Sequence, residues 1–441
     1  MSTGMPGSAL ERIARAHAAA RGRLRGGSAW DRRRSAALAR LLEQGLPDRR
    51  DENWKYLDWA EIDKRDFSLP ATVVAGGQLP EGALAELAQG TIVVLVAGRY
   101  VEGLSRVAVE PGVSVESLAS ALERDPGALA QALRVPGDGA DDRFALLAEA
   151  FLDDGVVIRV ADGATPEGPV YVLHVGAGAD ASHAHVLVEA GRNSRLQLIE
   201  HFLTADGTAC LSNLSCAVRL ADGASLDHLR LYQQGADAVH IETLVASQAR
   251  DSRYRQQLFV LGGRIVRSNL HVQLDGPAAE CDVHGLFMVD GSRQADLYTV
   301  IEHVAPNTRS NELVRGVASG RGRGAFNGRI VVGEGASKTD SQQSSRNLIL
   351  SPLAEINTRP QLEILTDDVK CSHGATTGAL DANQMFYLLS RGIDPDTARG
   401  LLTFAFCEDV VARVALPGLR RHVEELVVGR LPDRDIIREF V

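Results

Sequence analysis

Short apolar or alternating segments recur through the middle of the chain and predict many β-strands. Turn-forming pairs such as Asp162-Gly163, Asp222-Gly223 and Asp275-Gly276 separate these segments, and hardly any helical pattern interrupts them. The predicted strands cover residues 156–160, 170–175, 184–189, 196–201, 217–220, 226–232, 241–246, 258–260, 270–274, 285–289, 297–302, 328–332 and 347–350.

So many short strands over so long a span exceed what a typical β-sandwich holds. A β-helix accepts any number of strands, because each coil buries its apolar side against the next coil. We therefore expect a mainly β fold with a parallel β-solenoid core over residues 151–378. Two ordinary β domains in tandem are the alternative, since no strict repeat motif is visible.

The amino-terminal part has a different pattern. Residues 8–45 are rich in Ala, Leu and Arg without Pro, which predicts one or two helices ending near Gly45. Residues 91–96 read as a strand, and residues 114–122 and 126–133 read as short helices. We expect an amino-terminal helical and small α/β domain over residues 1–150.

Helices return after the strand region. Asp381 and Gln384 have capping-box spacing ahead of an apolar run, and Asp394-Pro395 is typical of a second helix start. The second helix has apolar residues on more than one face, so we expect it to be largely buried. Pro417 should end it, and residues 419–428 should form the last helix. Residues 379–441 are thus predicted to form a carboxyl-terminal helical domain.

Composition and charge exclude several classes of protein. The 441 residues are 45% apolar and carry a net charge of −10. The first 50 residues hold eleven arginines and four acidic residues, a charge of +7, so the rest carries −17. This acidic body argues against a nucleic-acid partner. No apolar run approaches the roughly 20 residues that span a bilayer, so no membrane segment is expected.

Two segments resemble nucleotide-binding motifs without their essential features. Residues 333–339 end in Ser337-Lys338-Thr339, but a P-loop needs Gly before the Lys and a helix after it. Residues 320–324 lack the strand–turn–helix context of a dinucleotide site. We expect both segments to be turns between strands, and we do not expect the chain to bind a nucleotide itself.

Cys371 and His373 form the most informative pair in the sequence. They lie two apart in a predicted strand, so their side chains should project from the same face. A thiolate beside an imidazole suits a soft metal ion. Two ligands cannot close such a site, so the pair indicates a half-site that another group completes.

The other histidines and cysteines have weaker patterns. His183 and His185, with His174 and His201 nearby, are either metal ligands or polar positions on a half-exposed strand. Cys407 should be a core residue of the long terminal helix. Cys210, Cys216 and Cys281 are expected to be strand cysteines, with a pairing of Cys281 and His284 as the alternative. Five scattered cysteines without C-x-x-C predict no disulfide framework and a cytoplasmic location.

Several segments together resemble the SufB/SufD family, the scaffold subunits of the Suf iron–sulfur cluster assembly system. Ala150-Phe151 and Asp154-Gly155 resemble the family's entry into its β domain, although Ala148 stands where Asn is expected. Gly374 after Cys-x-His and the missing amino-terminal cysteine cluster resemble the SufD branch. The remaining matching segments are Glu52-Asn53-Trp54-Lys55-Tyr56, Lys370-Cys371-Ser372-His373-Gly374-Ala375-Thr376, Leu380-Asp381, Phe386-Tyr387-Leu388 and Ser390-Arg391-Gly392-Ile393.

The resemblance implies a fold, partners and a role. The core would be a right-handed parallel β-helix that pairs with SufB, and the terminal helices would bind the ABC-type ATPase SufC. A nascent iron–sulfur cluster would form at the SufB–SufD interface with Cys371 and His373 as cofactor-binding and metal-ligating residues. The chain itself would be a non-catalytic scaffold without a tightly bound cofactor, and in isolation it could form a homodimer.

Two other functions fit part of the sequence. A SufB-like principal cluster holder would have more amino-terminal cysteines and another residue in place of Gly374. A β-helix carbohydrate-active enzyme would have a secretory signal, aromatic sugar platforms and paired carboxylates in a groove, none of which is visible.

Overall fold

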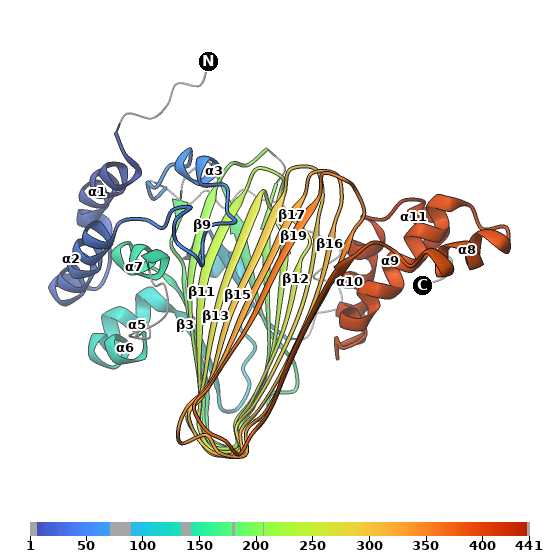
Figure 1. The fold of residues 1–441 in the computed structure, drawn as a ribbon. Helices are drawn as coiled ribbons and strands as arrows, with labels where there is room; N and C mark the ends of the chain where they lie inside the picture. Colours follow the sequence, from blue (N-terminus) through green and yellow to red (C-terminus); the bar gives the residue numbers. More distant parts are fainter. Residues whose placement is uncertain (1–6, 71–89, 134–142, 179–180, 206, 439–441) are drawn as a thin grey trace.

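A β-solenoid separates two groups of helices in the computed structural model of the chain (Figure 1). The structure describes residues 7–70, 90–133, 143–178, 181–205 and 207–438. Helices of the amino-terminal part cover one side of the solenoid, and the carboxyl-terminal helices lie on the opposite side. The mainly β fold with a parallel solenoid core is confirmed. The two tandem β domains considered as an alternative are wrong, because two continuous sheets run through the whole strand region.

Within the described residues the strands form two ten-stranded sheets, which we call sheet A and sheet B. The solenoid strands of each sheet are parallel and pair in register with the strand one coil earlier and one coil later. In spatial order, sheet A consists of β2 (Arg99–Tyr100), β1 (Thr91–Val96), β5 (Val170–Gly176), β8 (Arg195–Thr204), β10 (Ser225–Gln233), β12 (Arg253–Val260), β14 (Glu280–Val289), β16 (Arg309–Ala318), β18 (Asp340–Ile349) and β20 (Lys370–Gly378). Sheet B consists of β19 (Glu355–Ile364), β17 (Arg323–Val332), β15 (Gln294–His303), β13 (Ile265–Leu274), β11 (Val239–Gln248), β9 (Leu211–Leu220), β7 (His185–Ala190), β4 (Gly155–Val160) and β3 (Val113–Ser117), and β6 (Ala181–Ser182) pairs with β9.

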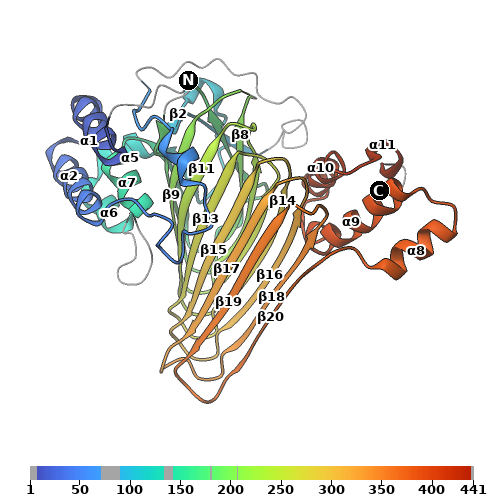
Figure 2. The same ribbon diagram turned by 45° about the horizontal axis from the view of Figure 1, so that its top comes forward.

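The interior of the solenoid is filled by every second residue of each strand. One core cluster runs through it from Val93 to Ile356 and includes Leu226, Tyr254 and Phe287. Glycines make room for the largest of these side chains. A Cβ at Gly316 would lie 2.2 Å from the Phe287 ring, so only glycine fits beside it. Among the residues that the structure describes, no further coil follows the last one, β19 and β20, on its outer edge (Figure 2).

The amino-terminal helices pack on the outer face of sheet B, chiefly through α7. Their buried contacts centre on Trp54, which is fully buried and stacks on Phe144 at 5.3 Å. The helices are α1 (Ala9–Ala20), η1 (Arg21–Arg23), α2 (Gly27–Gln44), α3 (Trp59–Asp63), α5 (Leu118–Arg124), α6 (Pro126–Ala132) and α7 (Arg143–Ala150), whereas the short η2 (Glu102–Leu104) lies beside β1 of sheet A. The predicted helices within residues 8–45 are therefore confirmed.

Two strands of the amino-terminal part extend the solenoid sheets. β1 pairs in parallel with β5, and β3 pairs with β4 in the antiparallel direction. Residues 114–117, which were expected to be helical, lie in β3, and the helix begins only at Leu118. The physical reason is the pairing with β4, a tertiary contact that overrides the local helical pattern.

Asp154 and Gly155 lie at the junction between the amino-terminal part and the solenoid. Asp154 is buried, and its carboxylate accepts hydrogen bonds from the backbone N–H groups of Tyr100 at 3.0 Å and Ala119 at 3.1 Å. Gly155 begins β4 with φ +152°, and a Cβ there would lie 1.8 Å from the carbonyl oxygen of His185. The position therefore requires glycine.

The carboxyl-terminal helices are α8 (Ala382–Ser390), α9 (Pro395–Val411), α10 (Pro417–Val428) and α11 (Arg434–Ile437). Asp381 caps α8 and Asp394 caps α9, as predicted. Two expectations were wrong in detail. Pro417 begins α10 rather than ending α9, and α11 follows as a further helix. α9 packs against sheet A and also against α8, α10 and α11, and seven of its 17 residues are buried. No helix among the described residues is long and apolar enough to cross a membrane.

Candidate functional site

Cys371 and His373 lie on β20, the edge strand that ends sheet A. Cys371 is opposite Ser341 and His373 is opposite Gln343 on β18. We call the two lines of opposed residues the Cys371 row and the His373 row. The Cys371 row continues with Ser341, Ser310, Cys281 and Tyr254, and the His373 row continues with Gln343, Glu312, Val283 and Gln256.

Both rows face the solenoid interior, because Cys281, Val283 and Tyr254 belong to its core cluster. The sequence prediction that the two side chains share a face is confirmed. They point toward the interior at the end of the solenoid, where no later coil covers them. Among the described residues, no group of three or more His, Cys, Asp or Glu side chains is arranged to hold a metal ion.

The two side chains have different surroundings. Cys371 is half-buried and packs against a small apolar cluster that includes Ile330, Val332 and Leu362. Burial raises the pKa of its thiol, with the Asp340 carboxylate adding to the rise and a backbone hydrogen bond at Ser341 opposing it. His373 is exposed. In the single chain, Cys371 is therefore a protonated thiol that needs a metal ion or a basic group to become a ligand.

A chain of hydroxyl groups lies behind Cys371 in its row. The Ser310 and Ser341 Oγ atoms are 2.7 Å apart, and His303 Nε2 is 2.9 Å from Ser310 Oγ. His303 Nδ1 is held by the Thr308 hydroxyl at 2.8 Å, and burial lowers the pKa of this histidine to about 4. The interior near Cys371 is thus polar and hydrogen-bonded.

A polar pair lies behind His373. Gln343 Nε2 donates to Glu312 Oε2 at 2.6 Å, and both side chains are buried. Burial raises the pKa of Glu312 to about 7, although hydrogen bonds from Thr299 and Gln343 oppose the rise. Gly328 on sheet B leaves the space for this pair, because a Cβ there would lie 2.3 Å from Gln343 Nε2.

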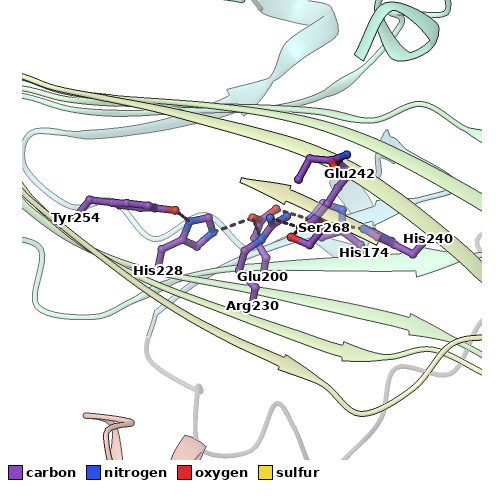
Figure 3. Close-up of polar contacts among 9 residues, drawn as sticks. His174, Glu200, His228, Arg230, His240, Glu242, Tyr254 and Ser268 are labelled. Carbon is purple, nitrogen blue, oxygen red and sulfur yellow. Dashed lines mark hydrogen bonds and ion pairs between the residues drawn. The ribbon is translucent and has the colours of Figure 1, made fainter. Parts of the chain in front are cut away.

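A larger buried network lies several coils away, nearer the amino-terminal helices (Figure 3). Two carboxylates, Glu200 on β8 and Glu242 on β11, flank the guanidinium of Arg230 on β10. Arg230 Nε lies 3.1 Å from Glu200 and Nη1 lies 2.7 Å from Glu242. We call this the Glu200–Glu242 network; its other members are His174, His228, His240, Tyr254 and Ser268.

The electrostatics of this network favour a fixed set of charges. Although burial alone would raise the pKa of each carboxyl, the Arg230 charge and histidine hydrogen bonds outweigh it, holding the pKa of Glu200 well below its usual range and that of Glu242 at about 2. Desolvation lowers the pKa of His228 and His240. Because Arg230 and Glu200 are on sheet A and Glu242 is on sheet B, the ion pairs connect the two sheets across the interior.

The sequence analysis missed Glu200, Arg230 and Glu242. The available signal was a charged residue at an inward-facing position of an apolar strand, such as Glu200 between Leu198 and Phe202. His174 was noted as a metal-site neighbour, but it hydrogen-bonds Glu200 at 2.9 Å. His201 instead lies on the outer face of β8, against Tyr171.

Neither interpretation of His183 and His185 is correct. Both side chains are buried, and desolvation lowers the pKa of each to about 3. His183 stacks on Phe151 at 4.7 Å and contacts Asn213 at 3.2 Å, so it is a neutral core histidine. The expected half-exposed strand position fails because the amino-terminal helices cover this face.

The remaining sequence candidates are structural. Cys407 is buried in α9, as predicted, and burial raises its thiol pKa to about 12. Cys281 faces the interior, and His284, three residues on, lies on the opposite face of β14, so the two do not form a pair. Residues 333–339 form the turn between β17 and β18, as expected. Of residues 320–324, only residues 320–322 lie in the turn before β17, because β17 already begins at Arg323.

Comparisons with known proteins agree with this architecture. The family described as "SUF system FeS cluster assembly, SufBD core domain" matches residues 173–406, and the "SufBD protein N-terminal region" matches residues 25–172. The chain is 32% identical to the iron–sulfur cluster assembly protein SufD of Escherichia coli over 90% of this chain and 92% of that protein.

Other relatives extend the same group. A Synechocystis iron–sulfur cluster assembly SufBD family protein is 28% identical over 90% of each chain. The SufD protein of Bacillus subtilis is 26% identical over 65% of this chain and 66% of that protein. The solenoid, its flanking helices and these matches lead to one conclusion: the chain belongs to the SufBD family of iron–sulfur cluster assembly proteins and is of the SufD type.

Proposed function

We propose that this chain is a scaffold subunit that pairs with a SufB subunit through the end of its solenoid formed by β19 and β20, which we call the open end. There it contributes Cys371 and His373 to a nascent iron–sulfur cluster at the interface. The observation that carries the proposal is the position of the pair. A thiol and an imidazole share the inward face of the last strand, where a second chain can bring the missing ligands.

The open end has the features of a strand-pairing surface. Within the described part of the chain, no strand pairs with the outer edges of β19 and β20, so their backbone N–H and C=O groups there are available to another strand. Exposed apolar side chains surround this end, with Leu353 67%, Ile364 40% and Leu365 54% exposed. A partner that continues both sheets would cover these residues.

We further propose that α8 is the main contact for the ATPase SufC. This helix stands away from the solenoid in both views (Figures 1 and 2) and has no buried residue. Phe386 is 73% exposed and Tyr387 is 57% exposed, with the Arg391 guanidinium over the tyrosine ring at 5.0 Å. Aromatic and arginine side chains grouped in this way are typical of a protein interface.

Under this proposal the chain is not itself a catalyst, and SufC supplies ATP hydrolysis. Movement of SufC would reach the solenoid through α9, which packs on sheet A by Cys407 and Val410. All five cysteines are free, which supports a reducing compartment such as the cytoplasm.

The test is anaerobic co-expression with SufB and SufC. Iron, sulfide and visible absorbance per purified complex are compared among wild type, Cys371→Ala, His373→Ala and the control Ser372→Ala, which lies between them on the opposite face of β20. We expect the complex to survive in all variants and the cluster to fall several-fold only in the first two. Unchanged cluster in both would show that the pair is not the assembly site.

A further inference from the structure

The amide of Gln343 has one unused hydrogen-bonding atom in the solenoid interior. The side chain is only 3% exposed, and its Nε2 donates to Glu312 at 2.6 Å. Its Oε1 is buried and has no hydrogen-bond partner among the described residues. An unpaired buried acceptor has lost its hydrogen bond to water without replacing it, so a nearby donor should be drawn to it.

His373 is the next residue outward in the same row. Neighbouring parallel strands lie about 4.8 Å apart, a distance that an imidazole ring spans when it turns along the row. The His373 ring is exposed at the open end, so no packing holds it away from Gln343. A ring nitrogen that carries hydrogen is a suitable donor for Oε1.

We propose that Gln343 is a positioning residue for His373, because its Oε1 accepts the hydrogen of one ring nitrogen and leaves the other nitrogen free to bind metal. The inference deepens the function proposed above and rests on it. A histidine ligand usually donates its second ring N–H to a neighbouring acceptor, which fixes the tautomer and the ring plane.

Glu312 determines which end of the amide faces His373. Since its Oε2 accepts from Gln343 Nε2, the amide oxygen is turned away from Glu312. Gly328 provides the space that the Gln343 amide occupies in this orientation, because any side chain at Gly328 would overlap with Nε2. The acceptor that reaches the site is thus neutral, and the ionisable carboxyl stays one coil deeper.

Nitrogen-15 NMR of histidine in the intact, metal-free chain tests the proposal. At about pH 8 a normal imidazole is neutral, and its two nitrogen shifts report the tautomer. The His373 signals are assigned by their loss in His373→Gln. We expect one dominant tautomer in wild type and a several-fold rise of the other in Gln343→Met, which keeps the length of the side chain.

The matched control is Gln256→Met. Gln256 is also buried in the His373 row, but three coils deeper, and its substitution should leave the His373 signals unchanged. Glu312→Gln is the second variant, because an amide pair allows both orientations of Gln343 and should also mix the tautomers. Wild-type His373 signals in either Gln343→Met or Glu312→Gln, once folded, would overturn the proposal.

A second measurement separates this inference from the proposed function. In the complex co-expressed with SufB and SufC, Gln343→Met should lower iron per complex several-fold while the yield of complex stays at the wild-type level. If His373→Ala abolishes the cluster but Gln343→Met changes neither tautomer nor iron, the assembly site stands and the positioning role is wrong. If Gln343→Met mixes the tautomers but His373→Ala keeps the cluster, the proposed function is wrong.

Discussion

At the residue scale, the buried ionisable groups divide into those that hold the fold and those that reach the open end. Arg230, Glu200 and Glu242 are fully buried and paired with one another. Cys371 and His373 have no charged partner in the described part of the chain other than the Asp340 carboxylate near the thiol. Paired buried charges specify structure, whereas potential ligands without such pairing at an exposed end suit the interfacial site proposed above.

Arg230→Met should destabilise the chain strongly. The substitution leaves two buried carboxylates without their cation, and such a loss costs about 3–5 kcal/mol in free energy of unfolding. The control is Arg255→Met, since the Arg255 side chain is 46% exposed and its pairing with Asp227 is worth at most about 1 kcal/mol. Urea unfolding followed by circular dichroism measures both. Equal losses would show that the network is not a special source of stability.

The buried histidines should make the chain sensitive to mild acid. Burial lowers the pKa of His183, His185 and His201 to about 3. The unfolded chain binds these protons below about pH 6.5 and the folded chain does not, so stability falls as pH drops from about 6.5 toward 3. At about pH 5 each histidine should cost on the order of 2 kcal/mol.

The acid effect has its own control. In His201→Gln, the free energy of unfolding should depend on pH less steeply by about one proton between about pH 6.5 and 4.5. Glu242 acts in another window, because its lowered pKa removes stability only below about pH 4.5. Unfolding free energies that are the same at neutral and mildly acidic pH would contradict the prediction.

At the element scale, the local sequence pattern predicted the interiors of the strands and helices better than it predicted those boundaries that tertiary contacts determine. The helix caps at Asp381 and Asp394 could be predicted, because a capping side chain is adjacent in sequence to the helix that it caps. Pro417 was predicted to end α9, because a proline can stop a helix as well as begin one, but here it begins α10. Residues 114–117 were misread because their strand partner, β4, lies about 40 residues away.

Gly155→Ala should damage the junction between the helices and the solenoid. The added Cβ would meet the carbonyl of His185 at 1.8 Å, and a left-handed φ adds strain of about 1–3 kcal/mol. We expect a loss of about 3 kcal/mol or an insoluble product. Gly374→Ala is the control, because nothing lies within 4 Å of its added Cβ and its φ is not positive. Similar urea midpoints for the two variants would disprove this account.

At the scale of the whole molecule, the sequence could predict the solenoid and the shared strand face of Cys371 and His373, but not the surroundings of this pair. Cys371 and His373 were found from a spacing of two residues. Ser341 and Gln343 stand behind them only because a coil is about 30 residues long and the coils pair in register. The local sequence pattern does not show which residues that far apart in the chain will lie side by side. The open end itself could not be predicted, since it depends on which strand has no further neighbour.

The last prediction concerns this open end. In β20, Lys370 donates its N–H to Thr339, on the β18 side, so the N–H groups of residues at odd positions point to the free edge. Ala375→Pro removes one outward N–H, and Gly374 before it tolerates the proline. We expect the free energy of unfolding of the isolated chain to change by less than about 1 kcal/mol, whereas co-purification with SufB falls several-fold. Thr376→Pro is the matched control, because it removes an N–H that pairs with β18 and should destabilise the isolated chain. If Ala375→Pro pairs with SufB as wild type does, the partner does not continue sheet A at β20, and the contact must come from side chains around the end.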